Sequence, residues 1–172
     1  MSLRDARIGV VDYKGEALLS SYVYVNPKNV VDYITRINGI TPAHLASAPT
    51  FETIRPRILA LLKDKILVGH AVYNDLAHIH HRHTYEDVRD TSLYYPLRAV
   101  LGIGREGEYP SLKRLYKEVF GTEIQVDTHD PVEDARASMR LFMHVREEFE
   151  TALASYQDCV AGIPRSYEKW FW

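Results

Sequence analysis

The order of hydrophobic patterns along the chain is the feature that most constrains its fold. Two runs rich in β-branched and aromatic residues, 7–13 and 20–25, flank the turn-forming segment Lys14-Gly15-Glu16 and predict an antiparallel hairpin. Amphipathic helical segments then alternate with short apolar runs. The expected helices cover 53–63, 72–82, 111–120 and 132–153, and the expected strands cover 65–70 and 87–91. A hairpin followed by alternating helices and strands predicts an α/β domain with a mixed sheet.

Local signals predict where these helices begin and end. Thr53 is the expected N-cap of the first helix, which leaves Pro56 in the first turn, where a missing N–H is tolerated. Ser111 and Gly121 are the expected N-cap and C-terminal stop of the third helix. The glycine-rich segment 94–109 is expected to be mostly loop.

Composition sets broad limits on the class of protein. The 172 residues are enough for one domain with a substantial core. A net charge of −2 gives no overall case for nucleic-acid binding, so any such case depends on local patches. The single cysteine, Cys159, excludes an intramolecular disulfide and fits the reducing nucleus or cytoplasm. No apolar run reaches membrane-spanning length, so no membrane partner is expected.

The segment before the last helix holds two candidate catalytic residues. His129 precedes Pro131, which suits the first helical turn, and Asp134 falls inside that turn, so both side chains can face one point. An imidazole can take a proton from water, and a fixed carboxylate can hold a divalent cation. Acidic residues are ordinary in first turns. Asp134 by itself is therefore a weak signal. A second candidate metal ligand, Asp75, lies early in the helix after the 65–70 strand and strengthens the interpretation.

Six ordered segments together resemble the DEDDh 3′→5′ exonucleases, and most closely the branch of the interferon-induced RNA exonuclease and the eukaryotic rRNA-processing exonucleases. The resemblance runs from about Ala6 to Glu148. The segments are Ala6–Ile8 with Val11–Tyr13, Thr35–Thr41, Ile66–His70 with Asn74–Leu76, Arg89–Ser92, Pro110–Leu115, and His129 with Val132–Arg136.

The resemblance implies a ribonuclease H-like fold and a chemistry. That chemistry is two-metal hydrolysis, with Mg²⁺ or Mn²⁺, of phosphodiester bonds at the 3′ end of RNA or single-stranded DNA. By position, Asp75 and Asp134 match metal-ligating aspartates of the family, and His129 matches its general base.

One family motif has no counterpart in this sequence. The family carries an Asp-x-Glu on a strand before the hairpin, and no such pair precedes Arg7. Two Mg²⁺ ions bring four positive charges, whereas Asp75 and Asp134 supply two negative ones, so weak metal binding and weak or absent activity are expected. That strand is central in the family fold, so its absence would leave its two neighbours with unpaired edges.

Three accounts of the absent motif follow. In the first, Met1 is an internal methionine of a longer product that carries the strand. In the second, the chain is a non-catalytic relative that binds nucleic acid or a protein partner. In the third, the strand is replaced through self-association with a second copy or by the C-terminal tail.

Several side chains are candidates for contacts with nucleic acid. Lys113 and Arg114 lie on the polar face of the 111–120 helix and could contact phosphates, with Arg98 and Arg105 of the preceding segment; a solvated face is an equal alternative. Tyr94 could stack on a terminal base, although packing is the commoner use of tyrosine.

Two further features fall outside the family motifs. The histidines at 78, 80, 81 and 83 could hold a metal, but a solvated helix end is favoured because no cysteine lies nearby. We divide the chain into an exonuclease-like domain, 1–155, and an aromatic tail, 156–172. The tail ends in Trp170-Phe171-Trp172 and is expected to dock on its own domain, with a partner interface as the alternative.

Overall fold

A computed structural model describes residues 6–26, 28, 39–105, 108–126 and 129–172 of the chain. The chain forms two compact units, each described here by itself. The first comprises 1–65 and 125–136, and the second comprises 66–124 and 137–172. Part of one predicted family segment, 35–38, lies outside the described residues.

The predicted hairpin is present in the first unit. Strand β1 (Arg7–Val11) pairs antiparallel with β2 (Ala17–Tyr22), with an irregularity in register at Val10 and Val11. The side chain of Asp12 closes the turn, because its Oδ1 accepts hydrogen bonds from the backbone N–H groups of Lys14 (2.8 Å) and Glu16 (2.9 Å). Strand β2 begins at Ala17, three residues before the predicted start at Ser20.

Two helices follow the hairpin, α2 (Pro42–Ala46) and α3 (Phe51–Leu62). The N-cap of α3 is Thr50, so the prediction that Thr53 caps this helix is wrong, and Pro56 lies inside the helix. A proline there removes one backbone hydrogen bond. The helix still forms because its apolar stripe, Ile54, Ile58 and Leu62, is buried at a helical spacing.

The second unit contains the two strands that are predicted at 65–70 and 87–91, and the structure pairs them in parallel. Strand β3 (Leu67–Gly69) pairs with β4 (Val88–Asp90), and α4 (Val72–His78) and the 3₁₀ turn η3 (Tyr85–Asp87) lie between them in sequence. Among the described residues the strands form two separate two-stranded sheets. The fold is thus mixed α/β with small sheets and flanking helices, which confirms the predicted class.

The segment expected to be loop contains a helix, α5 (Tyr95–Val100). Its buried side chains include Leu97 and Arg98. Arg98 is 0% exposed and donates hydrogen bonds to the carbonyl oxygens of Ser92 (3.3 Å) and Gly104 (3.0 Å). Burial excludes Arg98 from the predicted contacts with phosphate.

The core of the second unit forms where α6 (Leu112–Phe120) and α5 pack with the later turns of α7 (Pro131–Ala154). Leu141, Phe142 and Phe149 of α7 are buried in this core. Ser111 and Gly121 cap α6 as predicted. The aromatic ring of Tyr94 stacks on Phe149 with 4.0 Å between centroids.

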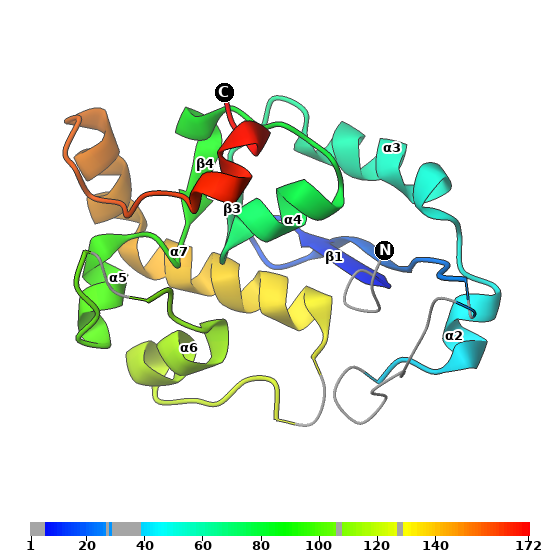
Figure 1. Ribbon diagram of the computed structural model, residues 1–172. Coiled ribbons are helices and arrows are strands. Elements are labelled where there is room, and N and C mark those ends of the chain that lie inside the picture. Colours follow the sequence, from blue (N-terminus) through cyan, green and yellow to red (C-terminus); the bar gives the residue numbers. More distant parts are fainter. Residues whose placement is uncertain (1–5, 27, 29–38, 106–107, 127–128) are drawn as a thin grey trace. The chain divides into compact units, whose positions relative to one another are not determined.

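The C-terminal tail docks on the second unit, as expected. Figure 1 shows its 3₁₀ turn, η4 (Arg165–Trp170), beside α4. The backbone N–H of His83 donates to the carbonyl oxygen of Trp170 (2.9 Å), and Phe171 is buried. His80 also stacks on Trp170 at 6.0 Å. The histidines at 80 and 83 therefore pack against the tail, so the favoured interpretation of a solvated helix end is wrong for His83, which is buried.

Within the described residues, no helix is both long and apolar enough to cross a membrane.

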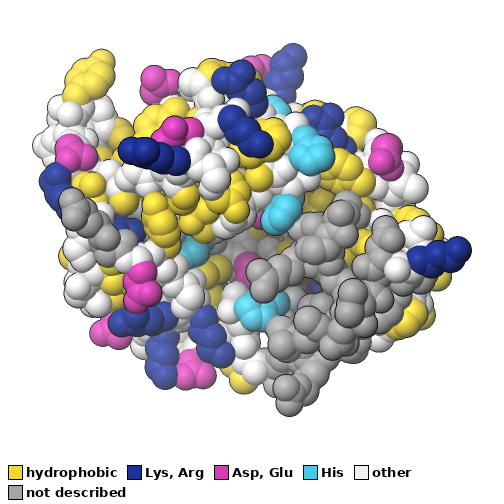
Figure 2. All heavy atoms as spheres, viewed as in Figure 1, with side chains coloured by type: hydrophobic (Ala, Val, Ile, Leu, Met, Phe, Trp, Pro, Cys, Tyr) yellow, Lys and Arg dark blue, Asp and Glu magenta, His cyan; other side chains and the backbone are white. Residues whose placement is uncertain are grey.

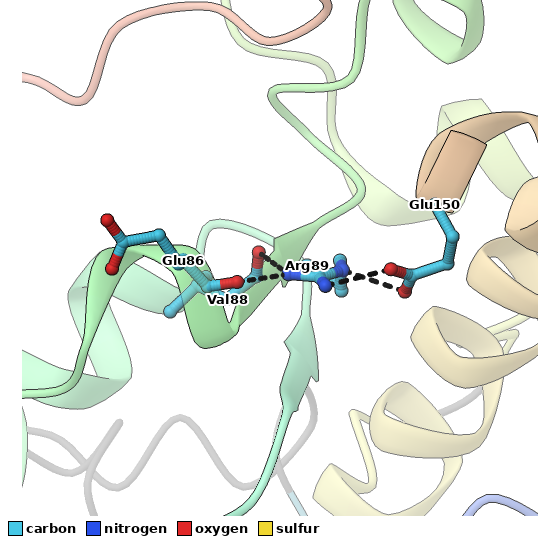
Figure 3. Close-up of polar contacts among 4 residues, drawn as sticks. All are labelled: Glu86, Val88, Arg89 and Glu150. Carbon is cyan, nitrogen blue, oxygen red and sulfur yellow. Dashed lines mark hydrogen bonds and ion pairs between the residues drawn. The ribbon is translucent and has the colours of Figure 1, made fainter. Parts of the chain in front are cut away.

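A charged pair joins β4 to α7 in the second unit. The guanidinium of Arg89 donates from Nε and Nη2 to the two carboxylate oxygens of Glu150, both at 2.8 Å, and from Nη1 to the carbonyl oxygens of Glu86 and Val88 (Figure 3). Because Arg89 is buried, the pair is more strongly hydrogen-bonded than an ordinary surface ion pair. The hydrogen bonds from Arg89 are also the main reason why the pKa of Glu150 is lowered.

We predict that Glu150→Gln destabilises the protein by about 2 kcal/mol at neutral pH, because it weakens charge-assisted hydrogen bonds. A carboxyl whose pKa is lowered by folding stabilises the fold above its unfolded pKa and loses that effect as the pH falls through its folded pKa. The cost of the substitution should therefore shrink on acidification. Urea denaturation between pH about 7 and about 4 measures this. Glu147→Gln, an exposed position on the same helix, is the control, and an equal cost of Glu150→Gln at every pH would contradict the prediction.

Candidate active site

The first turn of α7 is held against the hairpin of its own unit. A Cβ atom at Gly9 would lie 2.6 Å from backbone atoms of Pro131 and Val132, so only glycine permits this approach of β1 to the helix. The guanidinium of Arg7 pairs with the carboxylate of Asp130 at 2.8 Å. The other oxygen of Asp130 accepts from the N–H of Val132, also at 2.8 Å, and so caps the helix.

This arrangement brings the two predicted catalytic residues of the unit close together. Nδ1 of His129 lies 3.8 Å from Oδ2 of Asp134. The imidazole is half exposed, and the carboxylate is 29% exposed. Both side chains therefore lie at the start of α7, where the sequence placed them, and their catalytic roles remain predictions.

Gln125 contacts the same carboxylate. Its amide donates from Nε2 to Oδ1 of Asp134 at 2.6 Å, and its own backbone has a left-handed φ of 56°. Burial raises the pKa of Asp134, and the hydrogen bond from Gln125 partly offsets this by favouring the charged form. Burial thus disfavours the charged form of Asp134, and the hydrogen bond from Gln125 favours it.

Asp75, the third predicted site residue, lies in the second unit, exposed on α4. The start of α4 depends on Asp90 of β4, which is 3% exposed. The carboxylate of Asp90 accepts from the backbone N–H groups of Ala71 (2.9 Å) and Val72 (2.8 Å), and from both the N–H and the hydroxyl of Ser92. Ala71 itself has a left-handed backbone, so Asp90 replaces an ordinary N-cap side chain here.

Two of the predicted site residues have side chains that suit the predicted metal ions. Carboxylate oxygens such as those of Asp75 and Asp134 are the ligands that Mg²⁺ and Mn²⁺ prefer. No three His, Cys, Asp or Glu side chains gather closely enough to hold a metal ion in the described part of the chain. Asp75 and Asp134 therefore have suitable ligand chemistry, one in each unit.

The predicted contacts with nucleic acid divide into two groups. Lys and Arg side chains gather over α6 on the face shown in Figure 2. Arg114 is exposed and Lys113 partly exposed on this helix, while Lys117 forms a 2.6 Å ion pair with Glu123. Tyr94, by contrast, is 2% exposed and packed on Phe149, which argues against its predicted stacking on a base.

Three residues that support the site were missed in the sequence. Asp130 carries a signal, because an aspartate directly before a proline that begins a helix is a typical N-cap. Asp90 lies in the family-like segment Arg89–Ser92, but its hydrogen bonds to Ala71 and Val72 join residues distant in sequence. Gln125 carries no signal in the sequence, and its contact with Asp134 appears only in the structure.

Comparison with known proteins gives a consistent match. The family described as Exonuclease matches residues 6–142 of this chain. RNA exonuclease 4 of Aspergillus fumigatus is 40% identical over 146 residues, which cover 84% of this chain and 45% of the relative. RNA exonuclease 4 of Mus musculus is 36% identical over 150 residues, which cover 87% of this chain and 34% of the relative. The chain thus spans less than half the length of these two relatives.

Solved structures give the same match at the level of the fold. The Saccharomyces cerevisiae Pan2 pseudoubiquitin hydrolase–RNA exonuclease module in complex with A7 RNA has a TM-score of 0.68 and 27% identity, covering 87% of this chain and 27% of that chain. The Neurospora crassa Pan2 catalytic unit, with protease and nuclease domains, has a TM-score of 0.67 and 25% identity, covering 89% of this chain and 27% of that chain. Both agree with the ribonuclease H-like fold that the resemblance implies.

We predict that Gln125→Gly raises the pKa of Asp134 further, because the substitution removes the amide that favours the carboxylate. Glycine adopts the left-handed backbone without cost, so the change isolates the side chain. Carboxyl ¹³C NMR titration of the metal-free protein measures the pKa, with Asp134→Asn assigning the resonance. Gln157→Gly in the other unit is the control, and an unchanged pKa in Gln125→Gly would contradict the prediction.

We also predict that Asp90→Asn costs about 2–3 kcal/mol of stability, because an amide cannot accept all four hydrogen bonds and would direct its own N–H groups at donors. The backbone amides of Ala71 and Val72 should exchange faster with solvent, which hydrogen-exchange measurements detect. Asp87→Asn, at a less buried position three residues earlier, provides the comparison. Equal exchange in the two variants would show that Asp90 does not hold the start of α4.

Proposed function

Because the chain belongs to the exonuclease family, we propose that it is the nuclease part of an RNA exonuclease that removes nucleotides from the 3′ end. The observation that carries this proposal is the family match across residues 6–142, which includes Asp75, His129 and Asp134 in order. The relatives named RNA exonuclease 4 and the RNA-bound Pan2 modules favour RNA over single-stranded DNA as the substrate.

The proposed roles follow from the chemistry of the side chains. Asp134, desolvated but hydrogen-bonded by Gln125, and Asp75, exposed on α4, would provide carboxylate ligands for Mg²⁺ or Mn²⁺. When bound, such ions stabilise the attacking and leaving oxygens of phosphodiester hydrolysis. His129, half exposed beside Asp134, would accept the proton of the attacking water.

Lys113 and Arg114 would contact backbone phosphates from the polar face of α6, which supports binding without reading base sequence. Lys117 is a weaker candidate because Glu123 already neutralises it. The single buried cysteine fits residence in the nucleus or the cytoplasm.

A second candidate function is a non-catalytic module that binds RNA or a protein partner. It is favoured by one observation: no group of three metal-ligating side chains forms among the described residues. Under this proposal the basic face of α6 would still bind RNA, but without metal, and the affinity would fall steeply with salt.

The experiment compares residues 1–172 with a version extended at the N-terminus to include the family's Asp-x-Glu strand. Each is incubated with Mn²⁺ or Mg²⁺ and a 5′-labelled single-stranded RNA. The extended protein should shorten the RNA one nucleotide at a time and leave a circular RNA of the same sequence intact. The protein of residues 1–172 should be far less active, because its ligand set carries less negative charge.

Substitutions separate the catalytic role from general effects on folding. Asp134→Asn in the extended protein should reduce the rate roughly a hundredfold or more, as expected when one charge-stabilising group is lost. Glu133→Gln, the exposed neighbour on the same helix, should change it little. Unchanged activity in Asp134→Asn would reject the proposed site. An inert extended protein that still binds RNA without metal would support the module.

A further inference from the structure

The first unit contains a cleft whose described lining does not include His129 or Asp134. It has a volume of about 310 Å³, which is at the small end of ligand-binding sites. Strands β1 and β2, helix α2 and the loop after α2 form its walls. Its polar and aromatic lining consists of Arg7, Ser20, Ser21, Tyr22, His44 and Ser47.

The lining is rich in hydrogen-bond donors, and no carboxylate is among the described residues that form it. Among described partners, Arg7 uses one of its N–H groups on Asp130, which leaves further donors of the guanidinium for a ligand. The hydroxyls of Ser20 and Ser47 form no hydrogen bond to the described residues, whereas that of Ser21 already donates to the carbonyl oxygen of Tyr22.

His44 adds a donor of known orientation. Its Nδ1 accepts a hydrogen bond from the backbone N–H of Thr41 at 3.3 Å. In the neutral imidazole the proton must then be on Nε2, which is a donor. The ring stacks on Tyr22 with 4.8 Å between centroids and an interplanar angle of 17°, which limits its motion.

Arg7, the arginine of the cleft, is also held in place by its neighbours. Its guanidinium lies 5.3 Å from the centre of the Tyr22 ring and is ion-paired with Asp130. A guanidinium held by an aromatic ring and a carboxylate loses little entropy when an anion binds. Because Asp130 offsets part of its charge, the serine hydroxyls and His44 must contribute to holding an anion.

We propose that this cleft binds a phosphate group of the RNA backbone. Arginine, hydroxyl and imidazole donors match a phosphate, which only accepts hydrogen bonds when fully ionised, and Asp130 occupies only one N–H group of Arg7 among its described partners. The identification of RNA as the source of the phosphate rests on the proposed function. Arg7 joins the cleft to Asp130, the neighbour of His129, so bound RNA would contact the same unit that carries the His129–Asp134 pair.

The test measures RNA affinity without metal, so that it needs no catalysis. Ser20 is exposed on β2, and Ser20→Asp places a carboxylate in the cleft. We expect Ser20→Asp to weaken binding of a short single-stranded RNA about tenfold at low salt, because like charges then oppose each other. Ser20→Asn, similar in size but neutral, should change affinity less than about twofold.

Two further variants guard against general effects. Ser47→Asp introduces the same charge from another wall of the cleft and should weaken binding in the same direction. Thr151→Asp changes the net charge equally at an exposed position of the other unit and should leave affinity nearly unchanged. Circular dichroism confirms that each variant is folded.

Inorganic phosphate distinguishes the source of the anion. It should perturb the His44 imidazole resonances in the wild type and much less in Ser20→Asp. Perturbation by phosphate together with unaltered RNA affinity in both aspartate variants would overturn the proposal in favour of a free anion. Unaltered RNA affinity with no perturbation would also overturn it. If Ser20→Asp weakens RNA binding while the extended protein proves catalytically inert, this proposal stands and the proposed hydrolysis fails.

Discussion

The close approach of β1 to the first turn of α7 is the constraint on which the first unit depends. Gly9 permits backbone contact because a Cβ atom would collide with the helix start. The Arg7–Asp130 pair then fixes the helix cap in the same place. Since His129 directly precedes that cap and Asp134 lies one turn beyond it, the geometry of the proposed base and metal ligand follows from a contact between backbones.

In the second unit, the start of a helix is held by a buried carboxylate. Asp90 accepts the first N–H groups of α4 and so determines where the helix carrying Asp75 begins. The neighbouring Arg89 joins the same strand to α7 through Glu150. Two adjacent residues of β4 therefore have different structural roles: Arg89 ties the strand to α7, and Asp90 holds the start of α4. Neither is a proposed site residue.

The family match and the local geometry support each other at different levels. The match across residues 6–142 shows the exonuclease family, whereas the contacts among His129, Asp134 and Gln125 show how the proposed base and metal ligand are held. Burial raises the pKa of Asp134, and perturbed pKa values are frequent at functional sites.

The sequence by itself determined the hairpin, the existence of the two later strands, the long helix and the family, because periodic patterns and ordered motifs are local properties of the chain. The parallel pairing of the two later strands was seen only in the structure. It did not determine that Thr50 is the N-cap of α3, that 95–100 is helical or that Tyr94 and Arg98 are buried. Those outcomes depend on packing between distant segments, which overrides local preference. The contacts that Gln125, Asp90 and Arg7 make with Asp134, the start of α4 and Asp130 were likewise decided only by tertiary structure. No local sequence pattern links the two partners of each contact.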